Sequence, residues 1–139
     1  MPALTRIYVK TSLIWFTLAL IVSVGLAADT QWDLPRLFSV LNPVFFHMFL
    51  VGWVTQLIFG VVYWMFPKYS LEKPRRHEGL AWATYILLNL GLALRVVGEP
   101  LQTLYPTAGW GWFLVGSAIL QWAAGLAFVV NTWGRVKER

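Results

Sequence analysis

The stretch that decides the fold runs from Asn42 to Pro67 and reads NPVFFHMFLVGWVTQLIFGVVYWMFP. His47, near its start, is its only residue that can carry a charge near neutral pH. A helix needs about 20 predominantly apolar residues to cross a bilayer, and this stretch is long enough. An ionisable side chain inside such a helix is costly, so His47 is a candidate functional residue whose partner has to be found.

The composition of the whole chain indicates the same class of protein. Of the 139 residues, 58% are hydrophobic and 12% are charged, whereas about 25% are charged in soluble domains. The nine tryptophans fit a membrane protein, in which these side chains gather at the headgroups. The absence of cysteine excludes disulfides and thiolate chemistry. The basic residues lie at the ends of apolar stretches, so we expect the lipid bilayer, and no nucleic acid, as a partner.

Four apolar stretches predict an all-α membrane protein, a bundle of four transmembrane helices in one domain covering residues 1–139. The predicted spans are residues 11–27, 42–66, 80–97 and 110–133. Every Lys and Arg except Arg36 and Arg95 lies at one end of these spans, so the positive-inside rule predicts that both termini are cytoplasmic. We expect a multi-pass protein of the cell's inner (plasma) membrane. The first span ends in small residues that resemble a signal-peptide cleavage site, but we interpret it as a retained helix.

Two faces of the second span differ when its residues are placed at about 100° per residue. His47 begins a face of aliphatic side chains, namely Val51, Val54, Ile58, Val61 and Met65. Gly52, Gln56 and Gly60 follow one another at a spacing of four on a different side. Small residues at this spacing let a neighbouring helix approach closely, and an amide can hydrogen-bond across the contact. We therefore expect the glycines to pack against another helix.

Two interpretations of His47 stay open at this point. The aliphatic face below it suits a flat apolar ligand such as a haem ring, but the imidazole can equally bond a backbone carbonyl or reach the headgroups. Arg95 lies at the same outer end and could hold haem propionates, since its planar fork matches a carboxylate. Alternatively, Arg95 pairs with Glu99 one turn later or reaches the headgroups. His77 lies in the loop at the opposite end, about 30 Å away, and cannot share a ligand with His47.

Other polar residues within the spans are few. Thr55, Gln56, Asn89 and Gln121 are expected to tie helices together by hydrogen bonds. No acidic residue lies at the middle of a span, which argues against a proton pump or a cation-coupled transporter. Nothing in the sequence has the pattern of a serine triad, a phosphate loop or a multi-histidine metal site. We expect no independent enzyme.

The residues from His47 to Gly60, HMFLVGWVTQLIFG, followed by YWMFP at residues 63–67, resemble one helix of haem–copper oxidase subunit I. The similarity is strongest to the branch with C-type cytochrome oxidases and nitric oxide reductases, and to small four-helix proteins related to it. The resemblance covers about 26 residues closely and the four-helix layout loosely. The small relatives commonly have His-x-His at this point, whereas this chain has Phe45 at the first position and keeps only His47.

The resemblance implies that His47 is an axial ligand of a haem b near the outer face. It also implies at most half of a haem site, because the histidines of a binuclear oxygen- or nitric-oxide-reducing centre are missing. A second axial ligand would come from another copy of the chain or another subunit, or that position would stay open for a diatomic gas.

Two functions therefore follow as expectations. The first is a haem-b-binding membrane protein for electron transfer or diatomic-gas binding, with His47 as ligand and Arg95 near the propionates. The alternative is a structural or accessory subunit of a respiratory membrane complex without its own cofactor. In either case we expect a homo-oligomer or a part of a larger membrane complex.

Overall fold

The computed structural model describes residues 1–136, and all regular secondary structure in this part of the chain is helical. The helices are α1 (Ala3–Asp29), α2 (Asn42–His47), the π-helical η2 (Met48–Thr55), α3 (Gln56–Met65), α4 (Glu78–Leu104) and α5 (Gly111–Trp133), with a short 3₁₀ helix η1 (Phe38–Val40) before α2. Residues Asn42–Met65 are continuous, so four helices are long and apolar enough to cross a membrane. The prediction of an all-α bundle of four transmembrane helices is confirmed. The protein is a multi-pass membrane protein.

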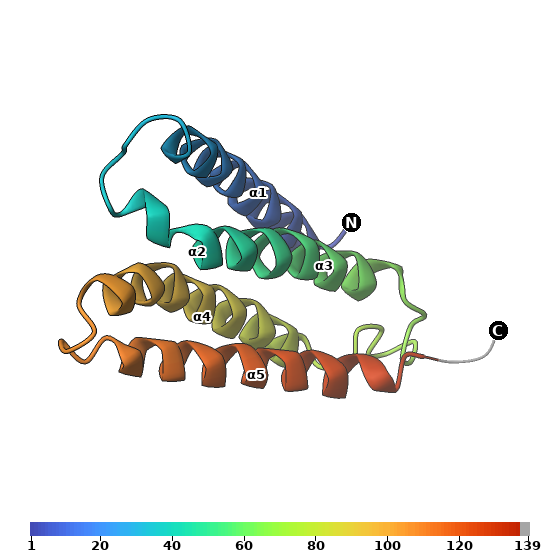
Figure 1. Cartoon of the computed structure of the whole chain (residues 1–139). Coiled ribbons are helices and arrows are strands. Elements are labelled where there is room, and N and C mark those ends of the chain that lie inside the picture. Colours follow the sequence, from blue (N-terminus) through green and yellow to red (C-terminus); the bar gives the residue numbers. More distant parts are fainter. Residues whose placement is uncertain (137–139) are drawn as a thin grey trace.

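Successive long helices run in opposite directions. The start of α1, the end of α3, the start of α4 and the end of α5 therefore lie at one end of the bundle (Figure 1). We call this end the basic end, because it carries most of the Lys and Arg residues. Of the basic residues assigned to this end, Lys137 and Arg139 lie outside the described residues. That the basic end faces the cytoplasm stays a prediction.

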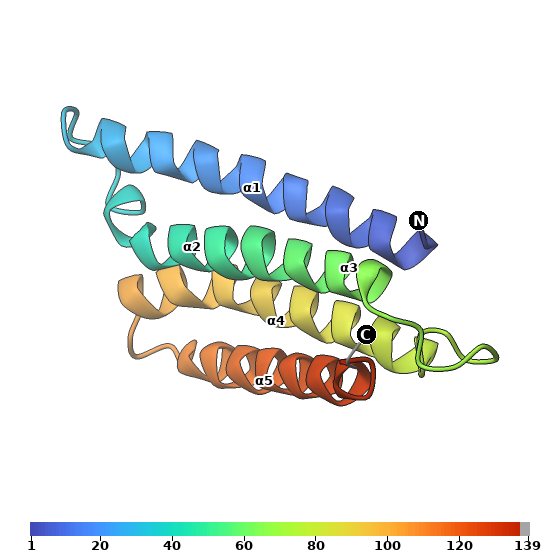
Figure 2. The ribbon, with the colours of Figure 1, turned by 90° about the vertical axis from the view of Figure 1, so that its right-hand side faces the viewer.

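The helices follow one another across the bundle in chain order, with α1 and α5 on the outside (Figure 2). α5 packs chiefly on α4, while α1 packs on η2 and α3. The outward surfaces of α1 and α5 carry exposed large apolar side chains, as a lipid-facing surface requires. The centre of the bundle is consequently formed by the second span and α4.

Two helices are longer than predicted. α1 begins at Ala3 rather than near residue 11, because Leu4 and Tyr8 pack in the core one turn apart while Arg6 and Lys10 point outward. α4 continues to Leu104 rather than ending near residue 97, and it contains Pro100. Proline usually ends or kinks a helix, since it lacks the backbone N–H. The extra turns matter because they keep Glu99 on a helix, one turn after Arg95.

The predicted close contact at the second-span glycines is confirmed. A Cβ atom at Gly52 would lie 2.7 Å from Cβ of Trp15, and one at Gly60 would lie 2.6 Å from Cβ of Tyr8. Both neighbours are on α1, so α1 reaches the backbone of the second span at two points. Any larger side chain there would have to push α1 away.

Gln56, between these glycines, does not make the predicted hydrogen bond. Its side chain is fully buried, and neither amide atom has a partner within residues 1–136. The buried hydroxyls of Ser12 on α1 and Thr84 on α4 donate to carbonyls of their own helices instead, to Val9 and Leu80. Around Gln56, the helices are thus held together by close packing rather than by a hydrogen bond between them.

Asn89 does tie helices together, as predicted. Its Oδ1 accepts a hydrogen bond from Nε1 of Trp15 at 3.0 Å, and its Nδ2 donates to the carbonyl of Tyr85. One turn away, the hydroxyls of Thr11 and Tyr85 lie 2.8 Å apart. The bonds of Trp15 and Thr11 join α1 to α4, whereas the bond to the Tyr85 carbonyl lies within α4. Unpaired polar groups in an apolar environment are costly.

Candidate functional site

His47 is the last residue of α2, and its imidazole is held by two oxygen atoms. Nδ1 lies 2.9 Å from the carbonyl oxygen of Pro43, one turn earlier, and 3.1 Å from Oε1 of Glu99 on α4. A carbonyl and an ionised carboxylate only accept hydrogen bonds, so Nδ1 carries the proton. In the neutral ring Nε2 is then the nitrogen with the lone pair, and no hydrogen bond to it is formed within residues 1–136.

Glu99 is a residue that the sequence did not single out for the site. Its side chain is only 10% exposed, whereas that of His47 is 30% exposed. Its second oxygen, Oε2, is buried and has no partner among the described residues. The spacing of four had indicated Glu99 only as a partner of Arg95, and no signal in the sequence linked it to His47, because Glu99 lies beyond the predicted span of residues 80–97.

Arg95 joins this pair to α5. Its Nη1 lies 3.5 Å from Oε1 of Glu99, and its Nε donates to the Ser117 hydroxyl at 3.1 Å. Of the alternatives for Arg95, the pairing with Glu99 is the one that the structure contains. The Arg95–Glu99 distance is long for a hydrogen bond, so the closer partner of the carboxylate is His47.

Ser117 completes the cluster and connects it to the backbone of α4. Its hydroxyl donates to the Gly91 carbonyl at 2.6 Å and also accepts from Nε2 of Gln121 at 3.1 Å. The lack of a side chain at Gly91 permits this close contact, because a Cβ there would lie 3.0 Å from the Ser117 carbonyl oxygen. We call His47, Glu99, Arg95, Ser117 and Gln121 the polar cluster; it links α2, α4 and α5.

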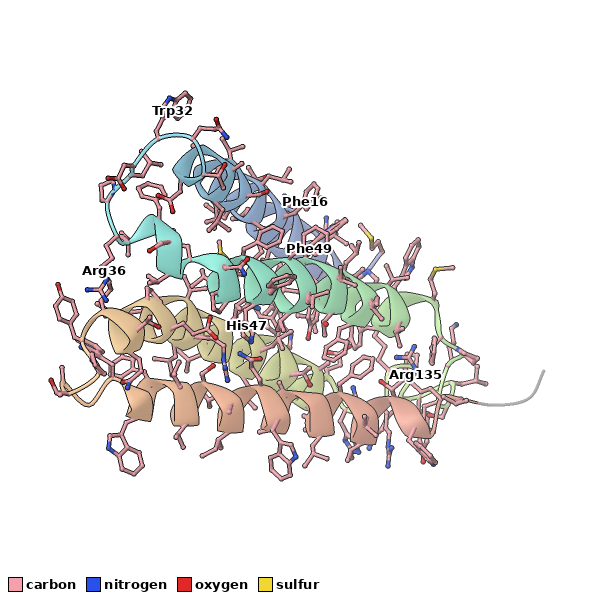
Figure 3. The ribbon with its side chains drawn as sticks, in the orientation of Figure 1. Phe16, Trp32, Arg36, His47, Phe49 and Arg135 are labelled. Atoms are coloured by element: carbon pink, nitrogen blue, oxygen red, sulfur yellow. The ribbon has the colours of Figure 1, made fainter. Side chains whose placement is uncertain are left out.

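His77 is remote from the polar cluster, as predicted. It immediately precedes α4, and its backbone N–H donates to Oδ1 of Asn131 at 3.1 Å. The cluster lies toward the other end of the same helix, with His47 and Arg135 toward opposite ends of the bundle (Figure 3). Within residues 1–136 no group of three His, Cys, Asp or Glu side chains could hold a metal ion. This finding does not concern a cofactor that takes a single protein ligand from each chain.

Comparisons with protein-family models, with curated proteins and with solved structures found no match to this chain. The resemblance to haem–copper oxidase subunit I therefore stays a prediction. What can be said of the site comes from its own chemistry: a histidine, a carboxylate and a guanidinium gathered within the membrane.

Proposed function

We propose that this protein binds haem b within the membrane, with Nε2 of His47 as one axial ligand. The observation that carries the proposal is the pair of oxygens on Nδ1, because they leave Nε2 as the lone-pair nitrogen. Metal-binding histidines commonly donate their other ring N–H to a carbonyl or carboxylate, which fixes the ring and raises its basicity. Pro43 and Glu99 would serve that purpose here.

The surroundings of His47 are compatible with a large apolar ligand approaching from the membrane. The imidazole is partly exposed, and Ile58 and Met65, two of the aliphatic residues assigned to its face, are 52% and 68% exposed. The π-helical η2 lies between His47 and these residues, so the angle between them differs from the one counted at 100° per residue. An outward-facing ligand would favour a homo-oligomer, in which a second chain covers the open side and supplies the other axial ligand.

Arg95 has a more limited part in this proposal than the sequence suggested. Its Nε and Nη1 are engaged by Ser117 and Glu99, so Nη2 is left to meet a propionate. The haem would supply one-electron transfer or a site for a diatomic gas. The chain's own residues would orient the axial imidazole and keep its surroundings apolar.

The test is an absorption spectrum of the purified protein, recorded before and after reduction with dithionite. We expect a Soret band and a sharp α band that are lost in His47→Ala and kept in His77→Ala, the matched control. Arg95→Leu should weaken haem retention, since a charge-assisted hydrogen bond contributes about 1.5–3 kcal/mol. An unchanged α band in haem-loaded His47→Ala would contradict the proposal.

A second function is favoured by the hydrogen bonds that Ser117 makes within the polar cluster. Ser117 uses its donor and accepts from both Arg95 and Gln121, which is how a purely structural helix contact is built. A structural or accessory subunit of a respiratory membrane complex would need nothing more. A preparation from its native membrane without a Soret band would support this alternative. For either function we propose the plasma membrane, with both termini in the cytoplasm.

A further inference from the structure

A crevice at the basic end of the bundle has features that no part of the proposed function uses. It has a volume of about 140 Å³ and lies between the start of α1, the end of α3 and the start of α4. The lining residues that matter here are Pro2, Leu4, Tyr63, Arg75, Glu78 and Trp82. We call it the Tyr63 crevice. Since three spans begin or end at this level, the crevice lies at the depth of the lipid headgroups.

Two guanidinium groups share the aromatic ring of Tyr63. That of Arg75 lies 5.6 Å and that of Arg135 lies 6.0 Å from the ring centroid. Arg135 is 2% exposed, and its Nη1 is buried without a partner within residues 1–136. Burial lowers the pKa of the Arg135 guanidinium from its ordinary value, and the positive charge of Arg75 also acts to lower it. Positive charge is therefore concentrated beside Tyr63.

The protein balances this charge only weakly. Among residues 1–136, Glu78 is the one carboxylate that lines the crevice. Its Oε1 lies 3.8 Å from Nη1 of Arg75, and its side chain is 71% exposed. Exposed ion pairs of this kind contribute little. By contrast, Arg76 is held away from the crevice, since its guanidinium bonds the Val130 carbonyl on α5 and lies over Tyr69. Arg75 is thus the cation that the crevice presents to a ligand.

We propose that the Tyr63 crevice binds the phosphate of an anionic phospholipid, with Arg75 as its principal contact. The phosphate adds the negative charge that Glu78 alone does not supply, and a guanidinium matches it with paired hydrogen bonds. A lipid fits better than a free phosphate, because the crevice also has apolar walls. Trp82 is 41% exposed beside it, and Pro2 lines it as well, so an acyl chain can continue along the bundle from the headgroup.

The test uses the full-length protein in a neutral detergent and measures the binding of phosphatidylglycerol and phosphatidylcholine by native mass spectrometry. We expect a clear preference for phosphatidylglycerol. Arg75→Gln should weaken phosphatidylglycerol binding about fivefold, the effect of one basic contact at a membrane surface. Lys68→Gln is the matched control, because it removes an exposed charge from the same end, and Lys68 does not line the crevice.

A second variant keeps the test informative if Arg75→Gln disturbs the fold. Glu78→Gln removes the carboxylate that competes for Arg75 and should tighten phosphatidylglycerol binding, a gain that misfolding cannot produce. Equal binding of the two lipids, or equal weakening by Arg75→Gln and Lys68→Gln, would overturn the proposal. Competition by inorganic phosphate alone at millimolar concentration would also overturn it, by showing a free-anion site.

Discussion

Glu99 is the residue around which the polar cluster is organised. A carboxylate that is 10% exposed at membrane depth needs cationic or hydrogen-bonding partners, because burying an unpaired charge is far more costly than burying a paired one. His47 and Arg95 both direct a nitrogen at its Oε1, while Oε2 stays unpaired within the described chain. The two partners come from α2 and from α4 itself, so this one side chain joins the span that carries His47 to the helix beside it.

The coupling between Arg95 and Glu99 can be measured by a double-mutant cycle. Arg95→Leu and Glu99→Leu should each lower stability, and the double variant should lose less than the sum, with a coupling of about 1–3 kcal/mol. Unfolding in detergent by a mild denaturant is the measurement. The exposed pair Arg75–Glu78, 3.8 Å apart, is the control, with an expected coupling of about 0.2–1 kcal/mol. Equal coupling in the two pairs would show that burial does not strengthen the inner pair.

At the scale of secondary-structure elements, two features fix the second span in the bundle. Gly52 and Gly60 let α1 lie against its backbone, and Arg135 closes its end. Arg135 follows α5 and donates to the carbonyl of Tyr63 in the last turn of the span and to those of Phe66 and Pro67 just after it. The terminal carbonyls of a helix have no partner within the helix. A cation at this end also interacts favourably with the negative end of the helix dipole. Helix contacts and an added cap thus complement each other along one span.

Replacing either second-span glycine by leucine should destabilise the bundle by about 1–3 kcal/mol, the usual effect of overpacking. The physical reason is the 2.6 Å and 2.7 Å approach of Tyr8 and Trp15 to the missing Cβ positions. Gly125→Leu on α5 is the control, because a Cβ there meets nothing within 4 Å. Thermal unfolding in detergent separates them. If Gly52→Leu and Gly60→Leu unfold at the temperature of the control, the second span does not contact α1 at these points.

Arg135→Ala should destabilise the protein by at least about 3 kcal/mol, because it removes three hydrogen bonds from a buried charged group, and such bonds contribute about 1.5–3 kcal/mol each. Arg36→Ala, which removes an exposed arginine at the other end of the bundle, should leave the stability unchanged. The difference is read from thermal unfolding and from the protection of the α3 carboxyl end in hydrogen exchange. Equal stability of the two variants would exclude a capping role for Arg135.

At the scale of the whole molecule, the ends of the bundle differ in charge. The basic end carries the loop between α3 and α4 and the start of α1, whereas the other end carries the α1–α2 and α4–α5 connections (Figure 1). This asymmetry favours one orientation in a membrane with a negatively charged inner leaflet. The two proposed sites also lie apart, with the proposed haem ligand His47 toward the end opposite the basic end and the proposed lipid crevice at the basic end.

The orientation can be tested without removing any native thiol, since the sequence has no cysteine. Single cysteines at Ser70, between α3 and α4, and at Thr107, between α4 and α5, should react with an impermeant maleimide from opposite sides of sealed vesicles. Ser70 should be protected in right-side-out vesicles and labelled in inverted ones. Labelling of both positions from one side would contradict the four-span arrangement, and the reverse pattern would invert the orientation.

The number of spans and their approximate ends could be derived from the sequence by itself. A bilayer core cannot satisfy backbone polar groups, so a long apolar stretch has to be a helix there whatever its neighbours are. The close contact at Gly52 and Gly60 could be predicted for a similar reason, since small residues at a spacing of four lie on one side of any helix. His47 was recognisable as a candidate because a histidine in an apolar span is unusual.

Glu99 could not be recognised from the sequence as the partner of His47, because contacts between helices depend on where each helix ends and how it is rotated. Only the structure shows that α4 passes through Pro100 and so presents Glu99 to His47. Only packing leaves Gln56 without a hydrogen-bond partner in residues 1–136, although an amide beside two glycines predicts a bond across the contact. Arg135 caps carbonyls up to 72 positions away in the chain, and no local pattern encodes that distance. Periodicity is a property of one helix, whereas these three contacts depend on the relative rotation and depth of several helices, which packing alone determines.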